Sequence, residues 1–416
     1  MRKLLIAPLF LLLLGACTDA EQNLETAQSS DDPFFVSEHS ALSIANSAVS
    51  SLDASLHPAK TRTSEKRQVK SVDLVYNATA FTRSEYLTGM NTGLYIVNYN
   101  DDKGFAVVSS DKRLRPIYAV SDSGSLHIRD TVGNKGLAIF FNIVNEDIAL
   151  TASKQPKLIV VDTKAFILNA QVPPLLWSGT RLWSQVAPYN AYCFTPDGKK
   201  SVAGCVAVAC GMAMSYFDWP KYIDGRMLLW RSMKKNGNND CIAYLFGRLG
   251  VKKLLDIEYT EDAGEASVEN VYRTFEQLGY LRPDVSKFFS TESVCAALVA
   301  ANQSHTNNKE GNGPVLVYGM NPITRDGHMW VIDGYAVNIQ KEDLSNLPYT
   351  YFHCVWGRNK GVNNGYFILK SGQIGGGVTI RDIDDSCDSV VYNKYTNLKY
   401  IINFKIDPAS NGDITL

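Results

Sequence analysis

The stretch that decides the fold is Gly204-Cys205-Val206-Ala207-Val208-Ala209-Cys210-Gly211-Met212-Ala213-Met214. Its continuous apolar character predicts a buried helix that begins at Cys205 and ends near Trp219-Pro220. The free N–H groups and the positive dipole end of a first helical turn stabilise a thiolate, so Cys205 is a candidate nucleophile. The alternative is an inert core cysteine, because free cysteine is among the most buried residue types.

A thiol nucleophile needs a base, and the chain contains six histidines: His39, His57, His127, His305, His328 and His353. The first three lie in the N-terminal half, and His305 falls in a polar segment. His328 opens an apolar stretch that predicts a strand, and an imidazole at the mouth of a strand can reach a helix start. His353 lies in the middle of another predicted strand and is the weaker candidate. A structural histidine is the alternative for both.

An acyl-transfer site also needs a hydrogen-bond donor for the oxyanion, usually the nucleophile's own N–H and a second group upstream. Gln185 is suitable, because a side-chain amide donates without titrating. Its flanks, Trp183 and the turn Pro188-Tyr189-Asn190, make an ordinary surface glutamine the weaker interpretation.

The remaining periodicity predicts an α+β fold in two halves. In the N-terminal half we expect helices at 40–52 and 135–152, a hairpin of 94–99 with 105–108, and a strand at 116–120. After a boundary near 170–174 we expect a helix at 267–278 and strands at 314–318, 328–335, 349–356 and 366–369.

Glutamine, then cysteine at a helix start, then histidine on a strand is an order that resembles the papain-like cysteine peptidases. The local motifs are similar to one family of them, the streptopain family. They are Trp183-x-Gln185, Pro188-Tyr189-Asn190, Gly204-Cys205-Val206-Ala207, Gly327-His328-x-x-Val331-Ile332-Asp333-Gly334 and Trp356-Gly357. In the first half, Tyr95-Ile96-Val97-Asn98, the stretch 104–113 and the stretch 118–125 resemble that family's inhibitory propeptide.

The resemblance implies a zymogen with a papain-like peptidase domain at 166–416 behind a small α+β inhibitory propeptide domain at 36–165. It implies that Cys205 is the nucleophile, His328 the general base and acid, and Gln185 the oxyanion donor. Trp356 matches the tryptophan that borders the histidine. The expected activity is endopeptidase hydrolysis of peptide bonds through a Cys205 thioester, with proteins or peptides as substrates and the propeptide as an intramolecular inhibitor.

Two residues depart from the family's usual His-x-Asn-Trp-Gly-Trp-Gly-Gly. Val355 replaces the asparagine that orients the catalytic imidazole, and Arg358 replaces the second tryptophan. Valine cannot hydrogen-bond a ring nitrogen, so His328 must borrow a partner, and Asn359 and Asn363 are close in sequence. The alternatives are therefore a catalytically impaired peptidase-fold protein that acts by binding peptides or as an inhibitor, or a different acyl transfer carried out by Cys205 and His328.

The N-terminus has the features of an export signal, with Arg2-Lys3 followed by an apolar stretch from Leu4 to Leu14. That stretch is too short to cross a bilayer. Its end, Leu14-Gly15-Ala16-Cys17, resembles a bacterial lipobox. We therefore expect residues 1–16 to be a lipoprotein signal, Cys17 to carry lipid that holds the exported protein on a membrane, and residues 17–35 to form a flexible tether. The alternative is ordinary cleavage nearby, with Cys17 incidental.

The net charge and the cysteine spacing argue against nucleic-acid binding and against metal binding. The formal net charge is −1, so no basic field points to nucleic acid as a partner. The eight cysteines form no CxxC pair and no Cys/His cluster with zinc spacing, so we expect neither a metal nor another cofactor. An exported protein can form disulfides, but these spacings reveal no pairing.

Overall fold

The computed structural model describes residues 32–58, 66–76, 93–127, 133–153, 166–286, 289–304, 312–321, 326–338, 349–369 and 397–416. The expected signal, Cys17, most of the tether and His305 lie outside these residues. None of the described helices is long and apolar enough to cross a membrane.

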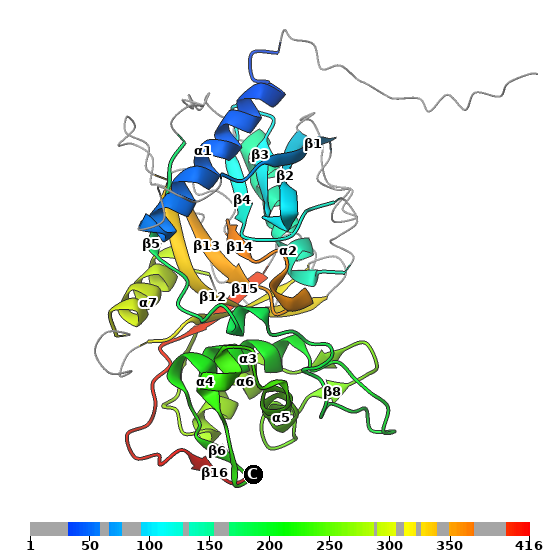
Figure 1. Cartoon of the computed structure of the whole chain (residues 1–416), viewed down its shortest axis with the longest axis vertical. Coiled ribbons are helices and arrows are strands. Elements are labelled where there is room, and N and C mark those ends of the chain that lie inside the picture. Colours follow the sequence, from blue (N-terminus) through cyan, green and yellow to red (C-terminus); the bar gives the residue numbers. More distant parts are fainter. Residues whose placement is uncertain are drawn as a thin grey trace, which may run out of the picture.

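Within the described residues, one 11-stranded sheet runs through both halves of the chain, and its strands pair antiparallel (Figure 1). Its order is β1 (Val69–Tyr76), β2 (Gly93–Tyr99), β3 (Phe105–Ser109), β4 (Ile117–Ser121), β14 (Gly365–Phe367), β13 (Thr350–Val355), β12 (Gly327–Asn338), β11 (Val315–Met320), β15 (Asn397–Ile402) and β10 (Asp284–Ser286). The remaining strand, β5 (Leu168–Val172), pairs with β12.

The two halves meet edge to edge, where β4 pairs with β14. Val120 lies opposite Tyr366, and the backbone N–H of Asp122 donates to the carbonyl of Asn364 at 2.8 Å. Strand edges carry unpaired N–H and C=O groups, and each half here satisfies the other's edge. The N-terminal half therefore extends the sheet of the second half.

The helices lie on both sides of this sheet. They are α1 (Glu38–Leu56), α2 (Lys135–Ser153), α3 (Cys205–Phe217), α4 (Trp230–Lys234), α5 (Asn239–Leu249), α6 (Val268–Gln277) and α7 (Thr291–Ser304). Figure 1 shows α1 lying across the N-terminal strands at the top, with α3 to α6 gathered in a layer at the bottom. Both α2 and α3 contact β11 and β12, so the two halves converge on the same strands.

Smaller elements complete the lower layer. Strands β6 (Tyr222–Ile223), β7 (Arg226–Met227) and β16 (Asp413–Ile414) form a small sheet, and β8 (Glu258–Tyr259) pairs with β9 (Gly264–Glu265). Single helical turns are η3 (Asn100–Asp102), η5 (Thr180–Leu182) and η6 (Asn359–Gly361).

Side-chain caps mark the starts of α1 and α6. The Ser37 hydroxyl accepts from the N–H of Ser40 at the start of α1, and Ser267 caps α6 in the same way. Helix α3 has no such cap, and its residues from Val206 to Phe217 are all buried. It is a core helix packed on all sides, as its continuous apolar sequence predicts.

The predicted α+β class is confirmed, and each predicted helix and strand has a counterpart within a few residues. The largest difference is at the predicted 40–52 helix, which continues to Leu56, and the predicted 366–369 strand ends early at Phe367. The sequence patterns did not predict β1, β5, β15, α5 or α7. Strand β5, with Asn169 and Gln171 in it, lacks the apolar alternation of a half-buried strand.

Candidate active site

Cys205 is the first residue of α3, and its half-buried side chain faces the strands of the second half. The residue before it, Gly204, has φ of +83°, a region that favours glycine. A Cβ at Gly204 would lie 2.8 Å from the carbonyl oxygen of Gly264. The close approach of β9 therefore requires glycine here, and the resulting sharp turn delivers Cys205 to the helix start.

The surroundings of Cys205 shift the pKa of its thiol in two opposing ways. Burial raises its pKa, although the backbone of Met329 and the positive charges of Arg358 and Lys135 favour the thiolate. Met329 directly follows His328 on β12, so the strand that carries the imidazole also contacts the sulfur.

His328 lies near the start of β12 and is 1% exposed. Its Nε2 lies 2.9 Å from the backbone carbonyl oxygen of Trp356. A carbonyl only accepts, so Nε2 carries the proton and the lone pair of the neutral ring is on Nδ1. Burial lowers the pKa of His328 to about 3, with Arg358 adding to the effect and the Trp356 carbonyl opposing it. In this covered state both the thiol and the imidazole are neutral.

The Trp356 carbonyl is itself held in place. The backbone N–H of Trp356 donates to Asn364 Oδ1 at 3.0 Å, and its indole N–H donates to the Asn363 carbonyl at 2.9 Å. The ring packs edge-on against Phe367. The partner of His328 is therefore a fixed backbone oxygen, and the buried Val355 beside it contributes no hydrogen bond from its side chain.

Gln185 lies just upstream of the α3 turn, tied to it by the Ala203 N–H, which donates to the Gln185 carbonyl at 2.8 Å. The side chain is 7% exposed, and its Nε2 has no hydrogen-bond partner among the described residues. A buried amide without a partner is costly, and an added acceptor would satisfy it. An oxyanion formed beside Cys205 is such an acceptor.

His353, the second candidate base, has both ring nitrogens occupied. Nδ1 lies 2.5 Å from Asp333 Oδ1 and Nε2 lies 2.7 Å from Asp122 Oδ2. Burial lowers its pKa, but the two carboxylates outweigh burial and raise it to about 9. An imidazole charged at neutral pH and bonded at both nitrogens cannot take a proton from Cys205. Its role is to link β12 and β13 to Asp122 at the end of β4.

The N-terminal half covers this site at the start of α2. A Cβ at Gly136 would lie 2.4 Å from the ring of Trp356, so the backbone of α2 sits directly on the indole. Lys135 forms an ion pair with Asp326 at 2.9 Å. The carbonyl of Gly133 accepts a hydrogen bond from Arg358. Three neighbouring residues of the N-terminal half thus close over the groups that the second half brings together.

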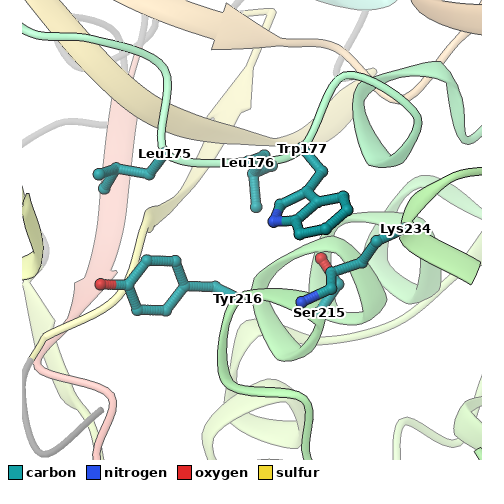
Figure 2. Close-up of a pocket in the computed structure, with 6 residues that line it drawn as sticks. All are labelled: Leu175, Leu176, Trp177, Ser215, Tyr216 and Lys234. Carbon is teal, nitrogen blue, oxygen red and sulfur yellow. The ribbon is translucent and has the colours of Figure 1, made fainter. Parts of the chain in front are cut away.

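A separate pocket lies at the other end of α3 (Figure 2). Its lining residues are Leu175, Leu176, Trp177, Ser215, Tyr216 and Lys234. Lys234 already pairs with Asp218 at 2.6 Å and lies 4.7 Å from the Trp177 ring centre. Ser215 is ten residues from Cys205, about 15 Å along a helix. The pocket is therefore remote from the cysteine.

The described residues contain no cluster of histidine, cysteine and carboxylate side chains that could hold a metal. Six cysteines fall within the described part of the chain, and all six are free: Cys193, Cys205, Cys210, Cys241, Cys295 and Cys354.

Sequence reasoning missed the groups that position the site. Asn364, Asp333 and Asp122 were not singled out, although Asp333 lies inside the motif quoted for His328. Asp122 lies inside the stretch 118–125 that resembles the propeptide, but nothing there shows its partner His353, which is 231 residues away in the chain. Arg358 was noted as a departure, but nothing in the sequence showed that its charge acts on both Cys205 and His328.

Two family models match this chain. Residues 183–367 match the Peptidase C10 family, and residues 33–148 match the Spi protease inhibitor family. The first match contains Gln185, Cys205, His328 and Trp356, and the second contains the segment 133–136 that covers them.

Individual relatives share less than a third of their residues with this chain. A streptopain from Streptococcus pyogenes serotype M28 is 27% identical over 335 residues, which is 68% of this chain and 75% of that protein. A streptopain from S. pyogenes serotype M1 is 26% identical over 330 residues, with the same two shares. Among solved structures, a prointerpain A fragment from Prevotella intermedia covers 80% of this chain and 98% of its own, at 18% identity and a TM-score of 0.49.

Proposed function

Because this chain belongs to the peptidase C10 (streptopain) family and carries the family's inhibitor domain in front, we propose that it is the zymogen of an active cysteine endopeptidase. The observation that carries the proposal is the hydrogen bond from His328 Nε2 to the Trp356 carbonyl. It fixes the tautomer whose Nδ1 can accept a proton, and so supplies what the missing asparagine would have supplied.

The mechanism follows from the positions of the groups. His328 Nδ1 takes the Cys205 proton as the sulfur attacks the substrate carbonyl. The Gln185 amide and the Cys205 N–H stabilise the oxyanion. As the C–N bond breaks, His328 returns the proton to the leaving amine and leaves a thioester on Cys205. A water then gives its proton to His328 and its hydroxyl to the acyl carbon; the C–S bond breaks, the carboxylic acid leaves, and His328 returns the proton to the Cys205 sulfur.

The covered state explains why the uncleaved chain would be inactive. Burial disfavours both the thiolate and the imidazolium, and the segment 133–136 lies where a substrate would enter. Removing the N-terminal half re-exposes the pair to water. We expect the pKa of Cys205 to fall and that of His328 to rise, which restores a reactive thiolate–imidazolium pair.

We further propose that the protein is exported and held on a membrane surface by lipid on Cys17. The support is the Arg2-Lys3 start, the apolar stretch behind it and the Leu14-Gly15-Ala16-Cys17 ending. A peptidase without a cofactor, acting on protein or peptide substrates outside the cytoplasm, fits this leader and the covered Cys205 site.

The alternative of an impaired peptidase rested on Val355 and Arg358. The Trp356 carbonyl weakens it, since the imidazole has an orienting partner without an asparagine side chain. No feature of the described residues favours transfer to an amine over hydrolysis.

The test is self-processing of the purified full chain followed by mass spectrometry. We expect cleavage between about residues 154 and 174 in the native chain and none in Cys205→Ala, which lacks the nucleophile. Cys295→Ala is the matched control, because Cys295 is also a free, half-buried thiol but lies on α7. The processed protein should then be labelled at Cys205 by a thiol-directed peptidase inhibitor. A processed protein that is neither labelled nor active on peptides would refute the proposal.

A further inference from the structure

Arg358 is the residue of the site that the mechanism above does not use. It stands two residues after Trp356, where the family pattern has a second tryptophan. Its backbone neighbour Gly357 approaches α3, and a Cβ there would lie 3.0 Å from Val208. The half-buried guanidinium acts electrostatically on both Cys205 and His328. Arg358 therefore lies beside the reacting groups.

The guanidinium lacks a counter-ion in the described part of the chain. Among the described residues, its side chain donates from Nη1 to the backbone carbonyl of Gly133. The other nearby cation, Lys135, is already paired with Asp326. A guanidinium has five N–H donors and remains charged, so covering it without an anion is costly.

The Gly133 carbonyl belongs to the half that must leave before a substrate can bind. Once it has gone, Arg358 loses that acceptor and its donors are left available to a substrate. In the uncleaved chain, Arg358 is hydrogen-bonded to an uncharged oxygen of the N-terminal half. After that half leaves, the substrate meets a positive charge at this site that has no partner among the described residues. A carboxylate is the group that a guanidinium binds best, in a two-pronged hydrogen-bonded pair.

The chemistry of His328 indicates which half of the substrate, before or after the scissile bond, passes Arg358. A general acid must stand beside the amine to which it gives a proton, so the leaving half of the peptide runs past His328. Arg358 follows Trp356, whose carbonyl holds that imidazole. Because Arg358 stands two residues beyond the carbonyl that holds His328, we expect the guanidinium on the His328 side of the pair, which the leaving half of the peptide passes.

We propose that Arg358 is a specificity residue that selects substrates with an aspartate or glutamate within the first two residues after the scissile bond. This inference rests on the proposed peptidase function. Arg358, at the position where the family has a tryptophan, would then select acidic peptides, which an indole could not do.

The experiment compares peptide pairs that differ only as glutamate or glutamine at the first or second position after the cleaved bond. With the processed protein, kcat/KM for the glutamate member should be higher on the order of 10- to 100-fold, as a charge-assisted hydrogen bond provides. Arg358→Gln should bring the ratio near one, and Arg358→Lys should keep part of it. Arg282→Gln is the control, because Arg282 is an exposed arginine stacked on Tyr272 outside the site.

The outcomes separate this inference from the function beneath it. Cleavage of both members at equal rates by the native protein would overturn the role of Arg358 and leave the peptidase intact; neutralisation of the guanidinium by Asp326 would give that result. A glutamate preference that survives in Arg358→Gln would also overturn it. Cleavage of neither member, together with no inhibitor labelling of Cys205, would refute the peptidase function and this inference with it.

Discussion

At the scale of the residue, the orientation of His328 depends on a backbone atom. The sequence singled out Cys205, Gln185, His328 and Trp356, and the structure brings the first turn of α3 and the start of β12 into contact. The sequence could not show the Trp356 carbonyl, because every residue has a carbonyl and its direction depends on the chain around it. Here Asn364 and Asn363 fix that direction.

If the carbonyl is the orienting group, restoring the family's asparagine should not help. Val355 is fully buried at the end of β13, so Val355→Asn places an amide in an apolar site at a cost of about 1–3 kcal/mol. We expect lower stability in urea unfolding and no gain in kcat/KM after processing. Val355→Thr, nearly identical in shape and with one hydroxyl, is the control. An increase of about tenfold or more in kcat/KM for Val355→Asn would show that the backbone partner is insufficient.

At the scale of the element, α3 was the most predictable part of the chain. Its continuous apolar sequence predicts a helix buried on all sides, and the structure buries every residue from Val206 to Phe217. Strand β5 was not predictable in the same way, because Asn169 and Gln171 give it no apolar face. It is a strand because β12 supplies its hydrogen bonds. Long-range pairing overrides weak local preference there.

The start of α3 should be sensitive to the loss of one glycine. Both Gly204 and Gly198 have a positive φ near +82°, so alanine at either position costs about 1–3 kcal/mol in backbone strain. At Gly204 the new methyl would also meet the Gly264 carbonyl, whereas nothing lies within 4 Å of Gly198. We expect Gly204→Ala to lose a further 1–3 kcal/mol or so and to slow the labelling of Cys205. Thermal unfolding and inhibitor labelling measure the two effects, and equal losses in both variants would contradict the role assigned to Gly264.

At the scale of the whole molecule, one sheet joins the inhibitor domain to the peptidase domain. The expected papain-like fold behind an inhibitory domain is confirmed by the two family matches, while the exact domain bounds stay a prediction. The pairing of β4 with β14 joins residues more than 240 positions apart, as in the bond from Ser121 to Asn364. No local pattern encodes such a partner, so the sequence indicated an inhibitor without showing where it binds.

His353 adds a charged contact across this junction. Its ring joins the peptidase domain's Asp333 to the inhibitor domain's Asp122, and Arg181 lies 3.8 Å from the same Asp122 carboxylate. Burial raises the pKa of Asp122, but His353 and Arg181 outweigh burial and lower it below the ordinary value. The contact is therefore strongest when the imidazole is protonated and the carboxyl is ionised.

The sign of the pH dependence follows from these two shifts. A carboxyl with a lowered folded pKa contributes stability above its unfolded pKa of about 3.9, and the contribution is lost as pH falls through the folded value. An imidazole with a raised pKa contributes fully below its unfolded pKa of about 6.5. That contribution is lost as pH rises through about 9. The link between the domains should therefore be strongest between about pH 4 and 6.5 and weaken on both sides.

Asp122→Asn, made in the Cys205→Ala chain to prevent processing, should reveal this window. Near pH 6 we expect it to lose about 1–3 kcal/mol of unfolding free energy, because the amide keeps a hydrogen bond but not the charge. The difference from the parent should shrink below pH 4 and again above pH 9. Asp240→Asn is the control, because the Tyr192 hydroxyl and Arg226 lower the pKa of Asp240 and neither partner is an imidazole; its loss of stability should shrink on the acid side and stay constant between about pH 6.5 and 9. A difference for Asp122→Asn that is as large at pH 10 as at pH 6 would mean that His353 is not the charged partner.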